Sequence, residues 1–243
     1  PEEKSKYLKG LFDETYLRDI IERHDIRNET EVLDTLLDFI SSVIGSLTNP
    51  SKLENRFLSE KKMKVTHTTI HKYLEYFEEA YLISSAQRYD IKGAACFDTP
   101  LKYYFTDIGL RNARLNFRQT EETHIMENII YNELRYRGFN IDVGEVNVSE
   151  KTERIDVNGK SIYAQKALEV DFIASKGDIK YYIQSALSMD DADKQLQEKR
   201  SLYYIDDSFK KIVVAKTGLR PSYDEKGVMI IDLFDFLMDN VEL

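Results

Sequence analysis

A group of residues in the second half of the chain has part of the set of residue types and spacings that metal-dependent phosphodiester hydrolysis requires. Glu127 lies on an expected helix, and Asp171 lies in the expected strand Glu169–Ile173. The turn Lys176-Gly177-Asp178 sends the chain back into another strand, so the hairpin brings Asp171 close to Gln184. In such sites the acids hold Mg²⁺, and a lysine two residues after the second acid position orients or activates water.

That lysine is absent, because Ala186 occupies its position after Gln184. An amide is a weaker ligand than a carboxylate for a hard cation, and alanine cannot activate water. We therefore predict no catalytic residue and interpret Glu127, Asp171, Gln184 and Ala186 as vestigial nuclease positions, with Asp171 as the metal-ligand candidate. An active Mg²⁺-dependent nuclease remains the alternative.

A second group of residues has the chemistry of nucleic-acid binding. The segment 51–72 carries six basic and two acidic side chains, and it runs into a helix that we expect Thr66 to cap. We predict contacts to DNA phosphates or bases by these residues and by two on the following hairpin: Lys61, Lys62, Lys64, His67, Thr68, His71, Lys72, Arg88 and Lys92. Base reading is assigned to His67, Thr68 and His71. The alternative is an ordinary solvated lysine cluster.

The first half must position these residues with helices and a hairpin. Apolar residues spaced by three and four predict a helix over 31–47, followed by helices over 51–60 and from 66. Segments 82–89 and 102–106 are rich in strand formers and flank a turn at 91–94. Three helices followed by a hairpin is the order of a winged helix-turn-helix. A helical bundle with an attached hairpin is the alternative.

The second half alternates helices and short strands. Helices are expected over 123–137, 190–204 and 233–241, and strands over 140–146, 167–175, 179–186, 211–215 and 228–231. This order indicates an α/β domain whose sheet is covered on both sides. We place the boundary between residues 117 and 118, giving a helical linker plus winged-helix domain (1–117) and a second domain (118–243).

Composition excludes several classes of function. The 243 residues include 34 basic and 43 acidic side chains, and a net charge of −9 rules out a uniformly basic nucleic-acid coat but allows a local basic face. The one cysteine, Cys96, excludes a disulfide framework and a multi-cysteine zinc site. The sequence has no P-loop motif, no G-x-G-x-x-G, no H-E-x-x-H and no G-x-S-x-G. Without an apolar run of roughly 18–20 residues, we expect a cytoplasmic protein that does not enter membranes.

Eight motifs together carry a family resemblance that covers the run from Phe12 to Leu243. They are Asp19–Arg23, Thr69–Leu74, Glu79–Ile83, Arg88–Gly93, Lys102–Asn112, Glu127–Leu134, Glu169–Ile173 and Tyr182–Gln184. The chain resembles the C-terminal region, a domain of unknown function, of predicted prokaryotic ATPases of the AAA superfamily.

The resemblance implies a fold of two α+β or α/β domains: a winged helix followed by a PD-(D/E)XK restriction-endonuclease-like domain. It also implies an ATP-binding P-loop domain before Pro1, so that ATP and Mg²⁺ are cofactors of the parent protein and none is expected in this chain. The expected partners are DNA and the chain's own N-terminal ATPase domain. Whether the chain also forms a homo-oligomer is left open. The leading hypothesis is a DNA-binding and regulatory module; a nuclease and a protein-interaction domain without a nucleic-acid role are the alternatives.

Overall fold

The computed structural model describes residues 2–27, 29–118, 121–155 and 161–238. Their contacts divide the chain into two compact units. The helical unit consists of residues Pro1–Ala86 and Thr99–Asn132, and the sheet unit consists of Gln87–Asp98 and Glu133–Leu243. The domain boundary expected between residues 117 and 118 stays a prediction, because a division by contacts does not test which parts of the chain fold independently.

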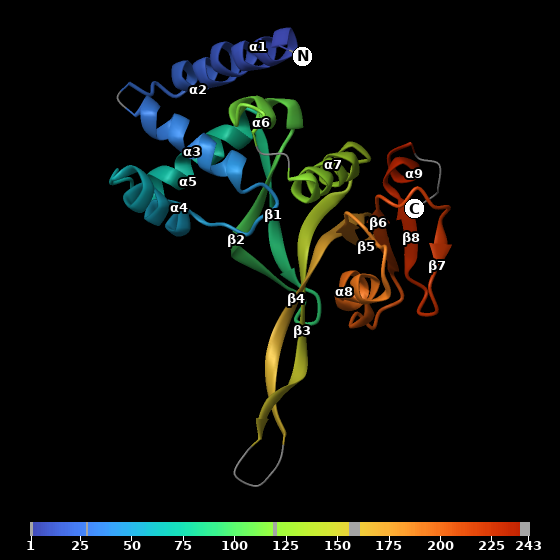
Figure 1. Cartoon of the computed structure of the whole chain (residues 1–243). Helices are drawn as coiled ribbons and strands as arrows, with labels where there is room; N and C mark the ends of the chain where they lie inside the picture. The colour runs from blue at the N-terminus through green and yellow to red at the C-terminus, as the bar shows by residue number, and fades with distance from the viewer. Residues whose placement is uncertain (1, 28, 119–120, 156–160, 239–243) are drawn as a thin grey trace. The chain divides into compact units, whose positions relative to one another are not determined.

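The helical unit is built around three helices that follow an N-terminal helical segment (Figure 1). Its helices are α1 (Glu2–Leu11), the π-helical η1 (Phe12–Leu17), α2 (Arg18–Arg23), α3 (Thr30–Ser42), α4 (Pro50–Arg56), the π-helical η2 (Phe57–Lys61), α5 (His67–Glu79) and α6 (Ile108–Arg114). Their apolar faces form one core that includes Leu36, Ile40, Phe57, Ile70 and Phe77, each at most 1% exposed. The helices predicted in the first half are therefore confirmed, with changed ends.

Helix α3 ends five residues earlier than its apolar pattern predicts. Gly45 adopts a left-handed conformation with φ of +68°, and its N–H donates to the carbonyl of Tyr103 at 3.1 Å. Thr48 then forms an antiparallel bridge with Leu101. Residues 43–47 thus leave the helix because their backbone turns toward the strand that contains Tyr103.

One sheet of eight strands runs through the chain in the order β2-β1-β3-β4-β5-β6-β8-β7. The strands are β1 (Ile83–Asp90), β2 (Ala95–Phe105), β3 (Asn140–Ile155), β4 (Ser161–Lys176), β5 (Ile179–Ala186), β6 (Lys210–Ala215), β7 (Ser222–Tyr223) and β8 (Met229–Asp232). β3, β4 and β5 pair antiparallel, whereas β1 with β3, β5 with β6 and β6 with β8 pair parallel. The chain is therefore a mixed helix-and-strand protein with a large mixed sheet.

Strands β3 and β4 are much longer than the sequence predicts. Their pairing continues beyond the expected ends, from Asn147 opposite Ala167 to Ile155 opposite Ser161. The added part projects from the sheet as a two-stranded ribbon (Figure 1). Its side chains on β4 are mostly exposed, so no apolar alternation marks it in the sequence.

Three further helices flank the strands. They are α7 (Glu122–Tyr136), α8 (Ala192–Tyr203) and α9 (Leu233–Leu237). Gly138, with φ of +82°, ends α7 as predicted, and its N–H donates to the carbonyl of Arg135. Leu202 of α8 packs into a sheet core with Val170, Tyr182 and Val213. Part of the helix predicted over 233–241 lies outside the described residues, and within these no helix is long and apolar enough to span a bilayer.

Candidate functional site

The basic stretch before α5 is exposed on the helical unit. Lys61 ends η2, Lys62 follows with a left-handed φ of +58°, and Lys64 lies two residues further on. All three side chains are exposed, and none of them forms an ion pair with another described residue. We call residues 61–64 the lysine loop. Its three ammonium groups are therefore available to an anionic partner.

The start of α5 continues this surface with polar side chains. The Thr66 side chain accepts a hydrogen bond from the Thr69 N–H at 3.2 Å, which confirms the predicted cap. Four residues of the helix predicted to contact DNA are exposed: His67, Thr68, His71 and Lys72. The opposite side of α5 buries Ile70 and Phe77 in the core. The burial pattern thus leaves the predicted contact residues facing solvent.

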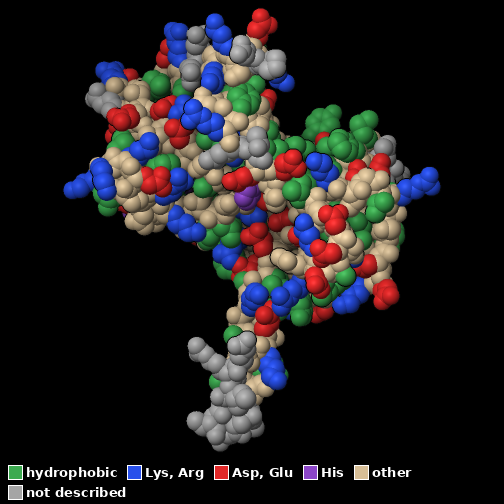
Figure 2. All heavy atoms as spheres, in the orientation of Figure 1, with side chains coloured by type: hydrophobic (Ala, Val, Ile, Leu, Met, Phe, Trp, Pro, Cys, Tyr) green, Lys and Arg blue, Asp and Glu red, His purple; other side chains and the backbone are tan. Residues whose placement is uncertain are grey.

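Acidic side chains lie close to both histidines. His67 Nδ1 is 3.4 Å from Glu54 Oε2, and His71 Nδ1 is 3.6 Å from Glu75 Oε2. On the face drawn in Figure 2, basic and acidic side chains are interspersed across the surface. Because acidic side chains lie among the basic ones and the net charge is −9, a nucleic-acid contact on this unit is confined to a small basic surface.

The two predicted hairpin contacts, Arg88 and Lys92, belong to the sheet unit. The Arg88 guanidinium forms an ion pair with Glu145 and lies 4.9 Å from the centroid of the Phe97 ring. Lys92 is exposed in the turn after β1, with its Nζ 5.9 Å from the centroid of the Tyr204 ring. The structure therefore groups these two cations with β3 and α8.

Glu127 is a buried partner in an ion pair. Its Oε1 accepts hydrogen bonds from Lys102 Nζ at 2.9 Å and from the Tyr104 hydroxyl at 2.7 Å. All three residues are nearly inaccessible, and a side chain at Gly45 would crowd the carboxylate, since its Cβ would lie 3.1 Å from Glu127 Oε2. The arrangement gives Glu127 a structural role within the helical unit.

Asp171 lies in the sheet unit at a β-bulge. Between the pairs Asp142–Ile173 and Gly144–Val170, β4 contributes two residues against one on β3. β4 and β5 pair with Phe172 opposite Ile183, as the predicted hairpin requires. The Asp171 N–H lies 3.4 Å from Gln184 Oε1, and Asp171 Oδ2 accepts a hydrogen bond from the Ser185 N–H at 2.8 Å. The structure thus brings Asp171 and Gln184 together.

The donor set around Asp171 does not fit a magnesium site. Ala186 is 1% exposed and packs with Leu202 and Val213, so apolar side chains fill the space at the lysine position. Gln184 offers only an amide oxygen, and Glu127 is bound to Lys102. Within the described part of the chain, no three His, Cys, Asp or Glu side chains gather where they could hold a metal ion.

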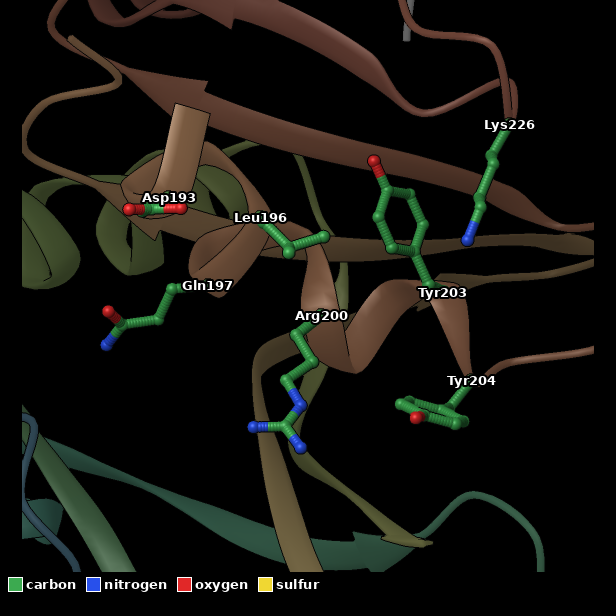
Figure 3. Close-up of a pocket in the computed structure, with 7 residues that line it drawn as sticks. All are labelled: Asp193, Leu196, Gln197, Arg200, Tyr203, Tyr204 and Lys226. Atoms are coloured by element: carbon green, nitrogen blue, oxygen red, sulfur yellow. The ribbon is translucent and has the colours of Figure 1, made fainter. Parts of the chain in front are cut away.

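A groove on α8 is a feature that the sequence did not reveal. It has a volume of about 730 Å³ and is lined by Asp193, Leu196, Gln197, Arg200, Tyr203, Tyr204 and Lys226 (Figure 3). In the sequence these residues belong to an ordinary polar helix and a distant turn. The one signal in the sequence is the spacing Arg200-x-x-Tyr203-Tyr204, which places a cation within about one helical turn of two aromatic rings.

One wall of the groove is fixed by a polar cluster. The Tyr203 hydroxyl donates to Asp224 Oδ2 at 2.7 Å, and Lys199 Nζ lies 3.3 Å from the same oxygen. Burial and the bond to Asp224 raise the pKa of Tyr203 to about 12. Burial alone would raise the pKa of Asp224, but hydrogen bonds from Tyr203 and from backbone N–H groups outweigh it and hold that pKa below its usual value.

Comparisons with known proteins give relatives of undescribed function. Residues 1–121 match a domain of unknown function, DUF8612. An uncharacterized protein of Haemophilus influenzae is 32% identical over 97% of this chain and 52% of its own length. The uncharacterized protein MJ1544 of Methanocaldococcus jannaschii is 29% identical over 87% of this chain and 46% of its own length. The chain thus spans about half the length of these curated relatives.

Among solved structures, the crystal structure of protein VC1899 from Vibrio cholerae aligns with 97% of this chain and 54% of its own. The identity is 13% and the TM-score is 0.32.

Proposed function

We propose that the helical unit binds duplex DNA through the lysine loop and the exposed side of α5. The observation that supports this most is the lysine loop itself, three exposed lysines without an ion-pair partner among the described residues, directly before a capped helix. Lysine ammonium groups bind phosphates by releasing condensed counterions, which provides affinity for any sequence. His67, Thr68 and His71 then lie where the N-terminal part of a recognition helix reads bases.

The order of elements also supports a winged-helix arrangement. Helices α3, α4 and α5 are followed by β1 and β2, which neighbour each other in the sheet. In this proposal α5 is the recognition helix and β1–β2 is the wing. The wing is unusual, because β1 also pairs with β3 through Arg88–Asp90.

For the sheet unit we propose a PD-(D/E)XK nuclease-like fold that no longer cleaves DNA. The order α7, β3, β4, β5, α8, β6 and the pairing of Asp171 with Gln184 support the nuclease-like fold. The buried Ala186 and the ion-paired Glu127 support the loss of cleavage. An enzyme that retains Mg²⁺-dependent cleavage remains the competing function.

For the parent protein we propose an AAA-type ATPase that this chain regulates. The curated relatives are about twice as long as the chain, which leaves room in them for a P-loop domain. ATP and Mg²⁺ would be bound by that domain, because this sequence has no P-loop motif.

The test is equilibrium binding of the chain to two labelled DNA duplexes of unrelated sequence. The variant is Lys61→Ala plus Lys64→Ala. Its matched control is Lys4→Ala plus Lys6→Ala, which removes two exposed lysines from α1 of the same unit. We expect the first pair to weaken both duplexes by about tenfold at low salt and the control pair to change binding less than about twofold.

Equal losses in the two double variants would reduce the effect to net charge and contradict the proposed site. Undetectable duplex binding by the wild-type chain would favour the protein-interaction alternative.

A further inference from the structure

We propose that the groove on α8 is a separate site for single-stranded DNA, in which a base stacks on Tyr204 and the cations beside it hold the adjoining phosphates. The groove lies wholly in the sheet unit, since its lining residues fall within Glu133–Leu243. The proposal therefore stands whether or not α5 binds duplex DNA.

The size and lining of the groove suit a nucleotide. Its volume of about 730 Å³ lies within the roughly 300–1,000 Å³ of small-ligand sites. Tyr204 is 41% exposed and Leu196 is 59% exposed, so apolar and aromatic surface faces the groove entrance. Figure 3 shows Tyr204 and Arg200 projecting from the same end of α8. An exposed ring is the group on which bases stack without regard to sequence.

Cations from three separate segments lie along the groove, one of them beside the Tyr204 ring. Arg200 lies one helical turn before Tyr204, Lys92 Nζ is 5.9 Å from the Tyr204 ring centroid, and Lys226 comes from the turn before β8. The nearby carboxylates are Asp193, which lines the groove, Glu150, which pairs with Arg200, Asp224, which binds Tyr203 and Lys199, and Glu225, which precedes Lys226 in the chain. Lys92 and Lys226 are the groove cations that lie over aromatic rings, and a cation beside an aromatic platform is the combination that single-strand sites use.

The surrounding side chains hold two of these groups in place. Glu150 on β3 binds the Arg200 guanidinium, which presents five N–H donors in a rigid fork. Lys226 Nζ lies 4.0 Å from the Tyr203 ring centroid, and the Tyr203 hydroxyl is bound to Asp224. Tyr203 is therefore a positioning residue for Lys226, whereas Tyr204 is exposed for stacking. Orienting the donors in advance lowers the entropy cost of binding.

Lys92 acquires a different role from the one predicted by sequence. Its turn is fixed by Asp90, whose Oδ1 accepts hydrogen bonds from the Lys92 N–H at 3.1 Å and the Gly93 N–H at 2.9 Å. The side chain then lies near Tyr204. We therefore assign Lys92 to the single-strand groove.

The experiment measures binding of the intact chain to fluorescently labelled oligothymidylate of about 12 nucleotides, a length within the range that one such site covers. Tyr204→Ala should weaken binding about tenfold, whereas Tyr204→Phe should bind like the wild type because it keeps the ring. Tyr136→Ala is the matched control, since Tyr136 is 89% exposed on α7 and lies outside the groove. This control should change binding less than about twofold.

Two further arms separate the competing explanations. Lys61→Ala plus Lys64→Ala should weaken oligothymidylate binding much less than Tyr204→Ala does while it weakens duplex binding about tenfold, which would place the single-strand site away from α5. Thymidine monophosphate should compete only at concentrations far above those of the oligonucleotide, because the single strand adds neighbouring phosphate contacts.

Four results would overturn the proposal. They are no oligothymidylate binding by the wild type, equal losses for Tyr204→Ala and Tyr136→Ala, a Tyr204→Phe variant as weak as Tyr204→Ala, and full loss in the lysine-loop variant. Monophosphate competing as well as the oligonucleotide would reassign the groove to a free nucleotide.

Discussion

The exposed lysines that we assign to nucleic-acid binding lie in different surroundings in the two units. In the helical unit the buried carboxylate of Glu127 holds the buried ammonium of Lys102, while the exposed lysine loop has no ion-pair partner among the described residues. In the sheet unit the buried carboxylate of Asp171 meets a backbone N–H, and the exposed cations Lys92 and Lys226 lie near aromatic rings. Unpaired lysines suit a phosphate backbone, whereas cations beside rings suit a stacked base.

Glu127 and Asp171 lie in different units and have different hydrogen-bond partners. Glu127 and Asp171 were predicted as members of one vestigial metal site. Lys102 and Tyr104 both donate to Oε1 of Glu127, which holds this carboxylate in a buried ion pair of the helical unit. Asp171 stands at a β-bulge beside Gln184, and bulges are over-represented next to active sites.

The largest expected effect concerns cleavage by the sheet unit. The wild type should not nick supercoiled plasmid in Mg²⁺ or Mn²⁺, because an incomplete catalytic set loses orders of magnitude in rate. Nicking by Gln184→Glu plus Ala186→Lys would assign the loss to these two positions, whereas a silent double variant would assign part of it to the ion-paired Glu127. Circular dichroism must accompany the assay, since the new lysine enters a buried apolar position.

Wild-type nicking that Asp171→Ala abolishes would contradict the proposed loss of cleavage and would establish the nuclease function. Nicking that survives Asp171→Ala would indicate a contaminating enzyme.

The buried ion pair should dominate the stability of the helical unit. Lys102→Met leaves Glu127 buried with only its Tyr104 hydrogen bond, so the free energy of unfolding should fall by about 3–5 kcal/mol. Urea unfolding followed by circular dichroism measures this change. Lys4→Met on exposed α1 is the control and should cost less than about 0.5 kcal/mol. A Lys102→Met loss as small as the control would show that the pair is not buried in solution.

The histidines on α5 should affect sequence preference. His67→Ala or His71→Ala should alter the ratio of affinities for different duplexes by about 1–3 kcal/mol for each base that the side chain no longer reads. A selection from randomised duplexes, repeated with each variant, measures the ratio. Uniform weakening across all sequences would assign the histidines to phosphates.

The smallest expected effect is a pH dependence in the sheet unit. The pKa of Tyr203 is raised to about 12 in the folded chain, so the stability from its bond to Asp224 is fully present below about pH 10 and is lost as the pH rises toward 12. The pKa of Asp224 is lowered, so its contribution is lost only in acid, as the pH falls below its ordinary value of 3.8. Tyr203→Phe should therefore flatten the alkaline limb of the stability profile measured by urea unfolding. An unchanged alkaline limb would show that the Tyr203–Asp224 bond does not contribute to stability at high pH.

Sequence patterns predicted the features that depend on neighbouring residues. The Thr66 cap, the buried side of α5, the end of α7 at Gly138 and the β4–β5 hairpin are all confirmed. Each depends on local backbone chemistry or on the register across one short turn.

Features formed by distant segments were not predictable in this way. Glu127 meets Lys102 across 25 residues, and the α8 groove combines Tyr204 with Lys92 and Lys226 from other parts of the chain. The β3–β4 ribbon consists of mostly polar residues whose backbones pair across the two strands, so its strands carry no apolar alternation.

The most direct test of the central claim is the salt dependence of duplex binding by the wild type and by Lys61→Ala plus Lys62→Ala plus Lys64→Ala. The slope of log K against log salt falls by about 0.9 for every phosphate that the protein no longer neutralises. If the lysine loop binds the backbone, the triple variant should lose about 3 units of slope along with its affinity. An unchanged slope would show that these lysines do not touch DNA and would contradict the account.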